Sequence, residues 1–561
     1  MIRKLIFNAA FGALVLLSPA QSFAADPIVG DATAGRRLYW EGVSSGGVPI
    51  KARTEGDIEI SGTQFSCVSC HRPSAYGGSE GGVYVPPIRG DLLFEASHGD
   101  RNRIFKELFL EAQSGEFWQK MRDPRSRPAY TDESLAAALV SGVDPAGRSL
   151  ENTMPRYQLS DKDAANVVAY LKTLTADPDP GVTRGSIHFA TIVTPGADKA
   201  DTDAVLATIN AFFKWKNLHT KGDLSSPGFS PLYRSEFLNT YRNWTLHTWE
   251  LKGEPETWSD QLDAYYKAQP VFAMVGGLVE GPHAPIADFC DRTGTPCIFP
   301  STELPQTRDV AYRYNIYFSR GRELEGQAMA YFVAGKNKGG AEVRQYYLED
   351  RLGVASAIPF LKTAEYYGAR VISQGFPDKE KLIEAVSACC DKNADALVVW
   401  PGAEALEIVP RLAGKGIQKI AVVGLPSDAI EPANAIGGKS GKNFRFAWPY
   451  EKPGVMHPRE FDVRAWMSAR KVPVTNPRLQ FEAYFALTMI EHSLQHLLGD
   501  FNREYLIELI EHEAEKNLNI GTYPTLALGP GQRFASKGAY VMRLDADAER
   551  GYSPDSDWIV P

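Results

Sequence analysis

The pattern of hydrophobic and polar positions divides the chain into two unlike parts. From about residue 26 to residue 175, apolar residues recur at helical spacing between long loops rich in glycine and proline. The segment 176–181 then places two prolines and a glycine among acidic residues, a composition that cannot continue a helix and stays solvated. The pattern therefore predicts a helical domain over residues 26–175, a linker over 176–183 and a second domain over 184–561.

The second part alternates short apolar runs, rich in residues typical of strands, with amphipathic helical stretches. Such alternation is the signature of parallel sheets that helices cover on both faces, and the span is long enough for two α/β lobes. We therefore expect a multidomain protein in which an all-α domain precedes a two-lobed α/β domain. The expected strands are 186–193, 244–251, 271–277, 296–301, 342–347, 394–400 and 419–425, with helices such as 256–269, 352–367 and 379–390 between them.

The first 25 residues have the three parts of a secretory signal. Arg3 and Lys4 supply the positive start, residues 9–17 the apolar stretch, and residues 22–24, Ser-Phe-Ala, the small residues that a signal peptidase needs. The alternative is a membrane anchor, but the apolar stretch is too short for a hydrocarbon core of ~30 Å, and Pro19 follows it. We therefore expect cleavage near residue 25, export to the periplasm and no membrane-spanning segment.

Charge and cysteine content narrow the class of partner. The formal net charge is −8, and removal of Arg3 and Lys4 with the leader makes it −10. An acidic balance argues against nucleic acid as the main partner. Six cysteines in 561 residues exclude a disulfide-rich scaffold, but they leave room for one disulfide or for a cofactor attached through thiols.

The pentapeptide Cys67–His71 is the strongest chemical signal in the chain. Its pattern, C-x-x-C-H, is typical of c-type haem attachment, in which Cys67 and Cys70 bind the two vinyl groups covalently and His71 becomes the proximal iron ligand. A redox-active thiol pair would need a strand before it, and a zinc site would need further cysteines or histidines nearby. Because the pentapeptide occurs once, we expect one haem c.

A haem with two axial ligands needs a second one from elsewhere in the chain. Met154 is the best candidate, because Pro155 and the preceding loop hold its sulfur on a non-helical segment. A thioether ligand raises the reduction potential relative to a second histidine. Met121 is the rival, but it lies in a charged, arginine-rich stretch and lacks a proline directly after it. With His71 and Met154 as iron ligands, we expect no catalysis at the iron.

These motifs make residues 30–175 resemble the class I c-type cytochromes. The entry helix 35–42, the proline loop 85–90 and the segment 154–157 follow in that family's order. The resemblance implies electron transfer with a periplasmic partner, a dehydrogenase or a cytochrome. It also implies that a backbone carbonyl of the proline loop accepts the Nδ1 proton of His71, and Pro87 is the expected residue. The stretch 91–128 is longer than in the smallest members of the family.

The second part is similar to another family. The segments 273–277, 296–302 and 315–320 occur in the order found in type I periplasmic binding proteins, the branch that includes leucine/isoleucine/valine receptors, and the similarity covers residues 184 to about 546. It implies two Rossmann-like lobes joined by three crossovers, with a small molecule held in the cleft between them.

The resemblance also implies where that ligand binds, because ligands of open parallel sheets lie beyond the carboxyl ends of the strands. Arg320 could grip a carboxylate and Trp400 could stack on an apolar ligand. The loop 277–281 and Glu303 lack the hydroxyl groups that amino-acid receptors present, which favours a less polar or non-amino-acid ligand, or none. The expected ligand-binding residues are Gly277, Ser301, Thr302, Arg320, Trp400 and Asp428.

Three weaker signals concern cysteine and histidine. Cys290 and Cys297 lie at a helix end and a strand start, where the sequence alone leaves open whether they form a disulfide. The adjacent pair at 389–390 is expected to be two buried thiols. His492 and His496 share one helix face at metal-binding spacing, but without a third ligand we expect surface residues.

Together these features predict an exported monohaem electron-transfer protein, not an enzyme, whose second domain senses or recruits a small molecule. One alternative is a substrate-binding protein of a transport system with an accessory haem. Another is a protein that oxidises the bound molecule itself, or the haem subunit of a periplasmic dehydrogenase system such as that of a quinoprotein alcohol dehydrogenase. A shift of the haem potential on ligand binding would favour the electron-transfer protein with a sensing or recruiting domain over these alternatives.

Overall fold

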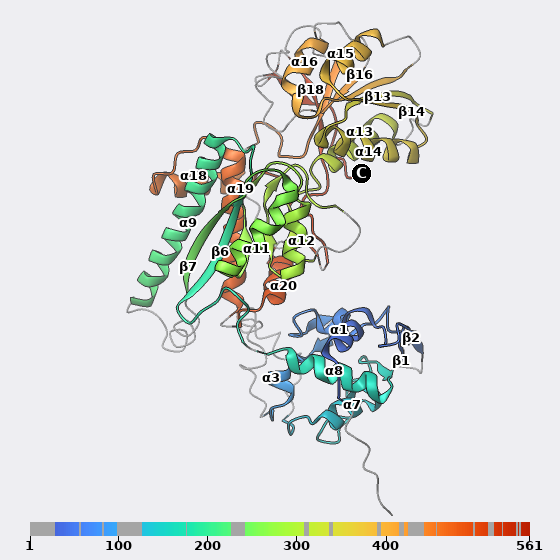
Figure 1. Ribbon diagram of the computed structural model, residues 1–561, viewed down its shortest axis with the longest axis vertical. Coiled ribbons are helices and arrows are strands. Elements are labelled where there is room, and N and C mark those ends of the chain that lie inside the picture. Colours follow the sequence, from blue (N-terminus) through green and yellow to red (C-terminus); the bar gives the residue numbers. More distant parts are fainter. Residues whose placement is uncertain are drawn as a thin grey trace, which may run out of the picture. The chain divides into compact units, whose positions relative to one another are not determined.

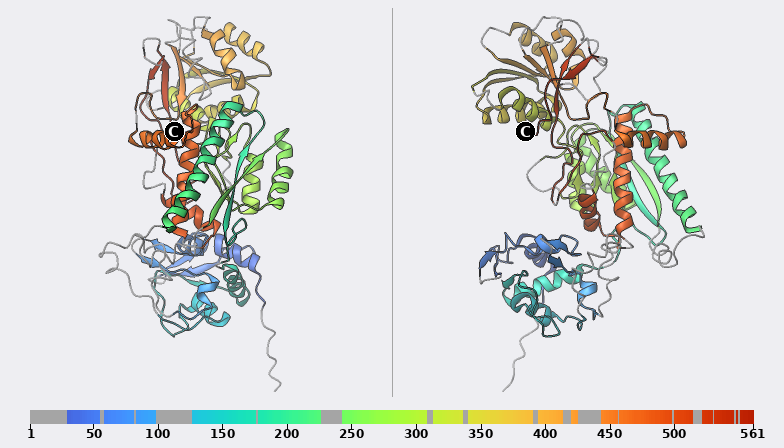
Figure 2. Two further views of the ribbon diagram at one scale, coloured as in Figure 1. Left: turned by 90° about the vertical axis from the view of Figure 1, so that its left-hand side faces the viewer. Right: turned by 180° about the vertical axis from the view of Figure 1, so that it is seen from behind.

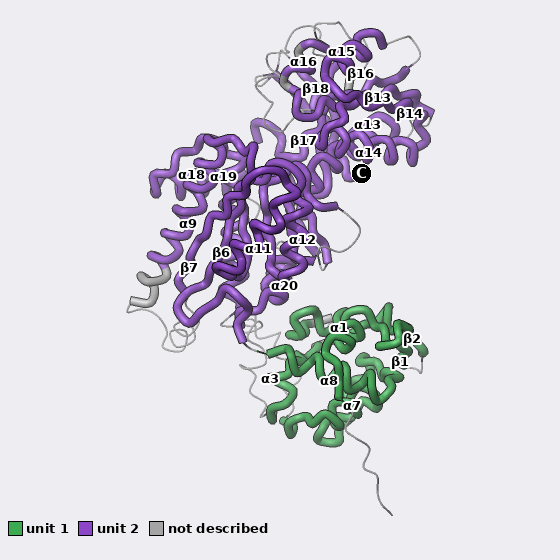
Figure 3. Tube along the Cα trace, in the orientation of Figure 1, with its two compact units in different colours: residues 1–99, 125–175 green, residues 100–124, 176–561 purple. Residues whose placement is uncertain are grey.

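In the computed structural model of the protein, the chain forms two compact units (Figure 3). Residues 1–99 and 125–175 form unit 1, and residues 100–124 and 176–561 form unit 2. The structure describes residues 29–54, 58–80, 83–97, 126–175, 177–225, 242–307, 313–335, 340–389, 394–413, 420–424, 443–455, 457–497, 500–513, 521–529, 531–545, 548 and 551–561.

Unit 1 is mainly helical, as the sequence pattern predicts. It also contains a three-stranded sheet of order β2-β1-β5 and a β3–β4 hairpin. The sequence analysis did not predict these strands, because segments such as Lys51–Arg53 are short and polar. Its helices are α1 (Ala32–Glu41), α2 (Cys67–His71), α3 (Gly90–Leu93), α7 (Asp132–Ser141) and α8 (Asp161–Thr173), and its strands are β1 (Lys51–Arg53), β2 (Glu59–Ser61), β3 (Gly78–Glu80), β4 (Val83–Val85) and β5 (Arg156–Gln158).

The first and last helices of unit 1, α1 and α8, pack closely against each other (Figure 1). A Cβ atom on Gly35 would lie 1.9 Å from the carbonyl oxygen of Asn166, so only glycine permits this approach. The Asn166 side chain in turn accepts a hydrogen bond from the backbone N–H of Asp31, the N-cap of α1. The rings of Tyr39 and Tyr170, 5.3 Å apart, fill the same interface.

A helix-and-turn unit occurs twice in unit 1, with an offset of one hundred residues that the sequence analysis did not detect. Both α1 and α7 end at a left-handed glycine, Gly42 with φ 65° and Gly142 with φ 67°. In each copy the glycine carbonyl accepts a bond from the residue eight positions on, Ile50 or Leu150, at 3.0 and 2.8 Å. The strands that follow the two turns, β1 and β5, then pair with each other.

The first lobe of unit 2 is a parallel sheet of order β11-β9-β6-β8-β10-β12, with β7 beside β6. Helices α9 and α19 lie on one face of it, and α11 and α12 on the other (Figures 1 and 2). The strands are β6 (Ser186–Val193), β7 (Asn243–Glu250), β8 (Ala273–Val275), β9 (Leu278–Val279), β10 (Cys297–Ile298), β11 (Ser301–Thr302) and β12 (Asn315–Ile316), and the helices are α9 (Lys199–Ser225), α11 (Trp258–Ala268), α12 (Ala284–Thr293), α18 (Pro458–Ala469), α19 (Pro477–Leu497) and α20 (Arg503–Glu513).

The second lobe has a sheet of order β14-β13-β15-β16-β17-β18-β19, in which the first five strands are parallel and the last two antiparallel. The chain passes between the lobes three times, after β12, after β17 and before β18. The strands are β13 (Glu342–Leu348), β14 (Arg370–Phe376), β15 (Ala396–Trp400), β16 (Ile420–Val423), β17 (Phe444–Trp448), β18 (Tyr540–Leu544) and β19 (Tyr552–Pro554), and the helices are α13 (Arg322–Ala334), α14 (Arg351–Tyr366), α15 (Lys379–Ala388) and α16 (Ala405–Ala413).

Part of the segment predicted as a linker is bound to the first lobe of unit 2. The buried Arg503 donates hydrogen bonds to the backbone carbonyls of Pro180, at 3.1 Å, and of Val271, at 2.6 Å. Its own N–H donates to the Asp179 carboxylate at 2.6 Å. This arginine therefore joins the entry of unit 2 to the sheet, because its five donors satisfy carbonyls that would otherwise be buried without partners.

A disulfide joins Cys290 and Cys297, the pair that the sequence left open. Their Cα atoms are 6.3 Å apart, within the usual range for a disulfide. The bond links the end of α12 to the start of β10, and both residues are buried in the first-lobe core.

Candidate functional site

The C-x-x-C-H pentapeptide forms the short helix α2 of unit 1. Cys67 is buried and Cys70 half-buried, and the two are not joined in a disulfide. Burial raises the pKa of the Cys67 thiol to about 12, which keeps it protonated. Two thiols on one helical turn have the spacing needed to form thioether bonds with one planar group.

Two buried tyrosines hold the ends of α2. The Tyr157 hydroxyl donates to the carbonyl of Phe65, just before the helix, at 2.8 Å. The Tyr39 hydroxyl donates to the carbonyl of Arg72, just after it, at 2.6 Å. Because Tyr157 belongs to β5 and Tyr39 to α1, two distant parts of unit 1 set the orientation of the pentapeptide.

The ring of His71 is fixed by a hydrogen bond from its Nδ1 to the carbonyl oxygen of Pro86, at 3.0 Å. The expectation of Pro87 is wrong by one residue. Successive carbonyls of an extended segment point in nearly opposite directions, so that only one of the two prolines can face the ring. Burial lowers the pKa of His71 to about 4, so at neutral pH the ring is neutral and Nε2 keeps its lone pair for a metal.

The predicted distal residue, Met154, lies in the loop before β5 and packs partly buried against the hydrophobic cluster that contains Cys67. Arg156 clamps this loop: it donates to the carbonyls of Met154 and Glu151, and to that of Leu150 at 3.0 Å. Its guanidinium also covers Gly142, where a Cβ would lie 1.8 Å from Nε. The rival ligand, Met121, lies outside the described residues.

Replacing Arg156 should loosen the Met154 loop without changing the loop's own sequence. Lysine keeps the charge but has no planar fork, so neither Arg156→Lys nor Arg156→Ala can bond three carbonyls at once. We expect both to cost unit 1 about 1–3 kcal/mol of unfolding free energy. Both should also weaken the red-edge charge-transfer band of methionine-ligated ferric haem. Unchanged band intensity in Arg156→Ala, relative to the exposed control Arg37→Ala, would rule out the clamp.

The buried Arg89 side chain bears on whether the residues around the pentapeptide fit a haem. Arg89 is 2% exposed, and it donates through Nε to Asp91 at 3.1 Å and through Nη1 to the Tyr76 hydroxyl at 2.6 Å. Its Nη2 is buried and has no hydrogen-bond partner among the described residues. Asp91 already supplies one anion, and the donor that remains could bond a carboxylate substituent of a porphyrin. With two thiols and a neutral imidazole, these residues fit a covalently held haem.

Two of the residues predicted to bind a ligand in unit 2, Ser301 and Gly277, lie beside a buried carboxylate. Glu482, on α19, is 2% exposed and accepts hydrogen bonds from Ser301 Oγ at 2.6 Å and from the Tyr523 hydroxyl at 2.9 Å. The backbone N–H of Ser301 donates to Gly277 at 3.1 Å, and Arg478 approaches the carboxylate at 3.6 Å. Burial, with Glu482 beside it, raises the pKa of Tyr523 well above its ordinary value.

Aromatic rings surround this carboxylate cluster of Gly277, Ser301, Arg478, Glu482 and Tyr523. The ring of Tyr523 lies 5.4 Å from that of Phe318 and 5.3 Å from that of Tyr450, and the Arg478 guanidinium lies 5.4 Å from the Tyr450 ring. The sequence analysis missed Glu482. The available signal was two polar residues, Gln480 and Glu482, within a run of apolar residues on one helix.

The other residues predicted to bind the ligand take no part in the bonds described for the carboxylate cluster. Thr302 accepts a bond from the backbone of Leu304 at 3.2 Å. Arg320 pairs with Glu323 on α13 at 2.9 Å. Trp400 is 1% exposed and packs in the second-lobe core, because its strand is covered on both faces. The buried ring has no free face on which a ligand could stack, in contrast to the expectation. Asp428 lies outside the described residues.

The described residues include neither a helix suited to cross a membrane nor a cluster of side chains suited to hold a metal ion. No helix there combines the length and apolar character needed to cross a bilayer, and the predicted signal segment lies outside the described part. No group of three or more histidine, cysteine, aspartate or glutamate side chains there is arranged to hold a metal ion. The predicted pair His492 and His496 is thus without a third ligand of that kind among the described residues.

Comparison with protein families places two known families along the chain. The model of the family described as periplasmic binding protein matches residues 250–549, and that of cytochrome c matches residues 62–175. No curated protein matches the chain.

Solved structures resemble unit 2 at low sequence identity. A branched-chain amino acid ABC transporter protein from Thermus thermophilus with bound valine is 11% identical, with a TM-score of 0.50, over 67% of this chain and 97% of that one. A leucine-binding protein, LivK, from Thermotoga maritima is 17% identical, with a TM-score of 0.47, over 67% and 99%. A fatty acid ABC transporter substrate-binding protein from Thermomonospora curvata is 14% identical, with a TM-score of 0.48, over 69% and 95%. At such identities the likeness concerns the fold alone.

Proposed function

The chain belongs to the periplasmic binding protein family, and from that membership together with the cytochrome c domain in front of it we propose an exported electron-transfer protein whose two-lobed domain binds a small molecule. The domain order confirms the predicted fold class, a cytochrome c domain followed by an α/β binding-protein fold. Both families are typically periplasmic. The proposed roles are one-electron relay by unit 1 and recruitment or sensing of a solute by unit 2.

The observation that carries the electron-transfer role is the set of bonds around His71. A ring held through Nδ1 by the Pro86 carbonyl, on the same short helix as the thiols of Cys67 and Cys70, is arranged to hold an iron porphyrin. When bound, the haem supplies reversible one-electron oxidation and reduction. The chain's own part is to attach it through Cys67 and Cys70 and to ligate it with His71 and Met154, which leaves no coordination position for substrate. One C-x-x-C-H motif in the whole sequence supports one haem per chain.

The observation that bears on the solute is the position of Glu482. A carboxyl group already accepts the Ser301 hydroxyl, so this serine is not free to hold a ligand carboxylate, and a second carboxylate beside Glu482 would be repelled. We therefore propose a ligand without a carboxylate at this position, one that is neutral or cationic and able to contact the rings of Tyr450 and Tyr523.

Ligand titration of the purified holoprotein tests the coupling between the two units. Mass spectrometry under native conditions first identifies any small molecule that co-purifies, and the haem potential is then measured with and without it. We expect a shift of the potential on binding. Tight binding with an unmoved potential would instead support a transport role with an accessory haem. Reduction of the haem by the ligand alone would support an oxidase and contradict the proposal.

A control titration with L-valine tests the ligand class separately. Valine carries an α-carboxylate, and the carboxylate cluster lacks a free hydroxyl at Ser301 to receive it. Calorimetry is expected to show no saturable binding of valine, and the same result is expected in the Met154→Ala variant, whose change is confined to unit 1. Saturable binding of valine would show that a carboxylate is accepted after all.

A further inference from the structure

Two histidines of the first lobe lie side by side on neighbouring strands, outside the sites described above. His188 lies on β6, opposite Thr245 of β7. His247 lies on β7, opposite Ala190 of β6, so that the two histidines are diagonal neighbours across one parallel strand pair (Figure 1). His188 Nδ1 is 2.9 Å from His247 Nε2, and both residues are half-buried. Solvent therefore reaches the pair.

Both rings project from the same face of the sheet. Side chains alternate between the two faces along a strand, so His188 shares a face with Ala190, and His247 shares a face with Trp249. Ala190 and Trp249 belong to one hydrophobic cluster, which also contains side chains of α11 and α12. The two imidazole rings are almost parallel, at 21°, with centroids 5.2 Å apart. The hydrogen-bonded strand pair therefore sets the spacing between the two rings.

The distance between the two ring nitrogens matches two metal ligands at a right angle. With metal–nitrogen bonds of about 2.0–2.1 Å, ligands at 90° lie about 2.8–3.0 Å apart, and ligands at the tetrahedral angle about 3.3–3.4 Å apart. The observed 2.9 Å therefore suits tetragonal copper(II) or nickel(II) better than tetrahedral zinc(II). Copper(II) has the highest affinity for nitrogen ligands in this series of metals, which makes it the expected ion.

Ser186 contacts the ring nitrogen of His188 that does not face His247. The Ser186 hydroxyl oxygen lies 2.9 Å from His188 Nε2. A metal-binding histidine normally donates from its second nitrogen to an oxygen atom, which fixes the ring and selects the tautomer. When His188 Nε2–H donates to Ser186, the Nδ1 of His188 presents a lone pair towards His247. This is the tautomer that a metal ion between the two rings requires.

The protonation state of the pair also suits a cation. Burial lowers the pKa of both His188 and His247, and the neighbouring ring lowers that of His247 further, so both rings are neutral at pH 7. With His188 Nδ1 as acceptor, His247 Nε2 carries the hydrogen of their hydrogen bond. A metal ion takes the place of this hydrogen when the proton of His247 moves to its own Nδ1, which leaves the net charge of the pair unchanged.

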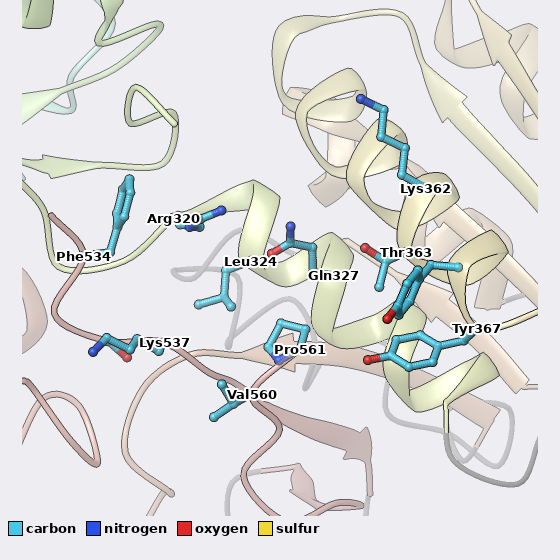
Figure 4. Close-up of a pocket in the computed structure, with 12 residues that line it drawn as sticks. Arg320, Leu324, Gln327, Lys362, Thr363, Tyr367, Phe534, Lys537, Val560 and Pro561 are labelled. Carbon is cyan, nitrogen blue, oxygen red and sulfur yellow. The ribbon is translucent and has the colours of Figure 1, made fainter. Parts of the chain in front are cut away.

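The cavity beside α13 and α14 offers no comparable set of ligands (Figure 4). It has a volume of about 620 Å³, and its lining side chains include the cations Arg320, Lys362 and Lys537. No histidine, cysteine, aspartate or glutamate side chain lines it. Cations repel a metal ion, so this cavity does not compete with the pair on β6 and β7.

We propose that His188 and His247 form a copper(II) site on the first lobe, in which water molecules complete the coordination. Two ligands from the chain agree with the finding that no group of three or more histidine, cysteine, aspartate or glutamate side chains among the described residues is arranged to hold a metal ion. Ser186 is a positioning residue, because it touches His188 and not the ion. The inference depends neither on the haem nor on the proposed solute.

Titration of the full-length holoprotein with copper(II) chloride, after treatment with a chelator, tests the proposal. Calorimetry gives the number of ions bound and their affinity. Pulsed electron paramagnetic resonance counts the imidazole ligands, because the remote nitrogen of a copper-bound ring modulates the echo; the copper-free holoprotein supplies the background of the ferric haem. His188→Gln and His247→Gln each remove one ligand, and Ser186→Ala removes the positioning contact. His492→Gln, on α19, is the matched control.

We expect one copper(II) ion per chain, with two imidazole ligands in the parent protein. Ser186→Ala should keep both imidazoles and weaken binding by about tenfold, as is usual for a group that orients a ligand. Each ligand variant should show at most one imidazole and a larger loss of affinity, and His492→Gln should bind as the parent does.

Three results would overturn the proposal. The first is the lack of saturable copper binding at micromolar concentration, or fewer than two imidazoles in the parent protein, a count that does not depend on how the variants fold. The second is a two-imidazole signal that survives in His188→Gln or His247→Gln. The third is loss of that signal in His492→Gln, which would place the ion on α19.

Discussion

The double variant Cys67→Ser/Cys70→Ser is expected to contain no haem that survives denaturation, even when it is produced together with a cytochrome maturation system. Serine cannot form the thioether bonds, and the remaining ligands from the chain hold iron only by coordination, which unfolding breaks. Covalent haem should fall from one per chain to none. Haem staining of a denaturing gel and the mass of the intact chain both report this result.

A matched control shows that the loss belongs to this thiol pair. Cys389→Ser changes a free, half-buried cysteine of unit 2 and should keep the full covalent haem content. Haem that stays attached in the double variant would disprove attachment at α2. A parent protein that is colourless under the same conditions would remove the basis of the electron-transfer proposal while leaving the binding-protein fold untouched.

Met154→Ala is expected to abolish the red-edge charge-transfer band of the ferric protein and to lower its reduction potential. The soft thioether stabilises reduced iron, so its loss favours the oxidised state. We expect a fall of roughly 0.1–0.3 V, part of the ~0.8 V range over which axial ligands set haem potentials. Absorption spectra and redox titration measure both effects, and covalent haem content should not change, because Cys67 and Cys70 are intact.

Two comparisons separate ligation from a general effect on unit 1. Met121→Ala should leave the band and the potential as they are, because that residue is not expected to reach the iron. Arg156→Ala should weaken the band without matching Met154→Ala, since the sulfur remains but its loop is less firmly held. If Met121→Ala abolishes the band and Met154→Ala does not, the distal assignment is wrong.

In unit 1, neighbouring residues in the sequence were enough to predict the haem-attachment motif but not every contact around it. The pentapeptide Cys67–His71 predicts its own chemistry because the two thiols and the imidazole lie within two turns of backbone. The partner of His71 is harder, since the carbonyl lies fifteen residues on and the choice between Pro86 and Pro87 depends on how one extended segment is rotated. That rotation follows from the packing of the loop and not from its composition.

In unit 2, the sequence pattern predicted the fold but not the contacts of the candidate ligand-binding residues. Alternating apolar runs were enough to predict parallel α/β lobes, because the pattern reflects strands that are covered on both faces. They could not predict the hydrogen-bond partner of Ser301, because Glu482 lies 181 residues away on helix α19. They also misjudged Trp400, which follows the same strand-end rule as Ser301 but lies inside the second-lobe core.

By itself, then, the sequence indicated the two fold classes, the break between them and the motif that predicts covalent haem attachment at α2. These depend on periodicity and on neighbouring residues, which an amino-acid string states directly. Only the tertiary structure decided that the Pro86 carbonyl faces His71, that Arg156 clamps the Met154 loop and that Glu482 occupies the Ser301 hydroxyl. Each of these depends on how the chain is arranged in space, whether the partners are 2 residues apart, as Arg156 and Met154 are, or 181, as Ser301 and Glu482 are.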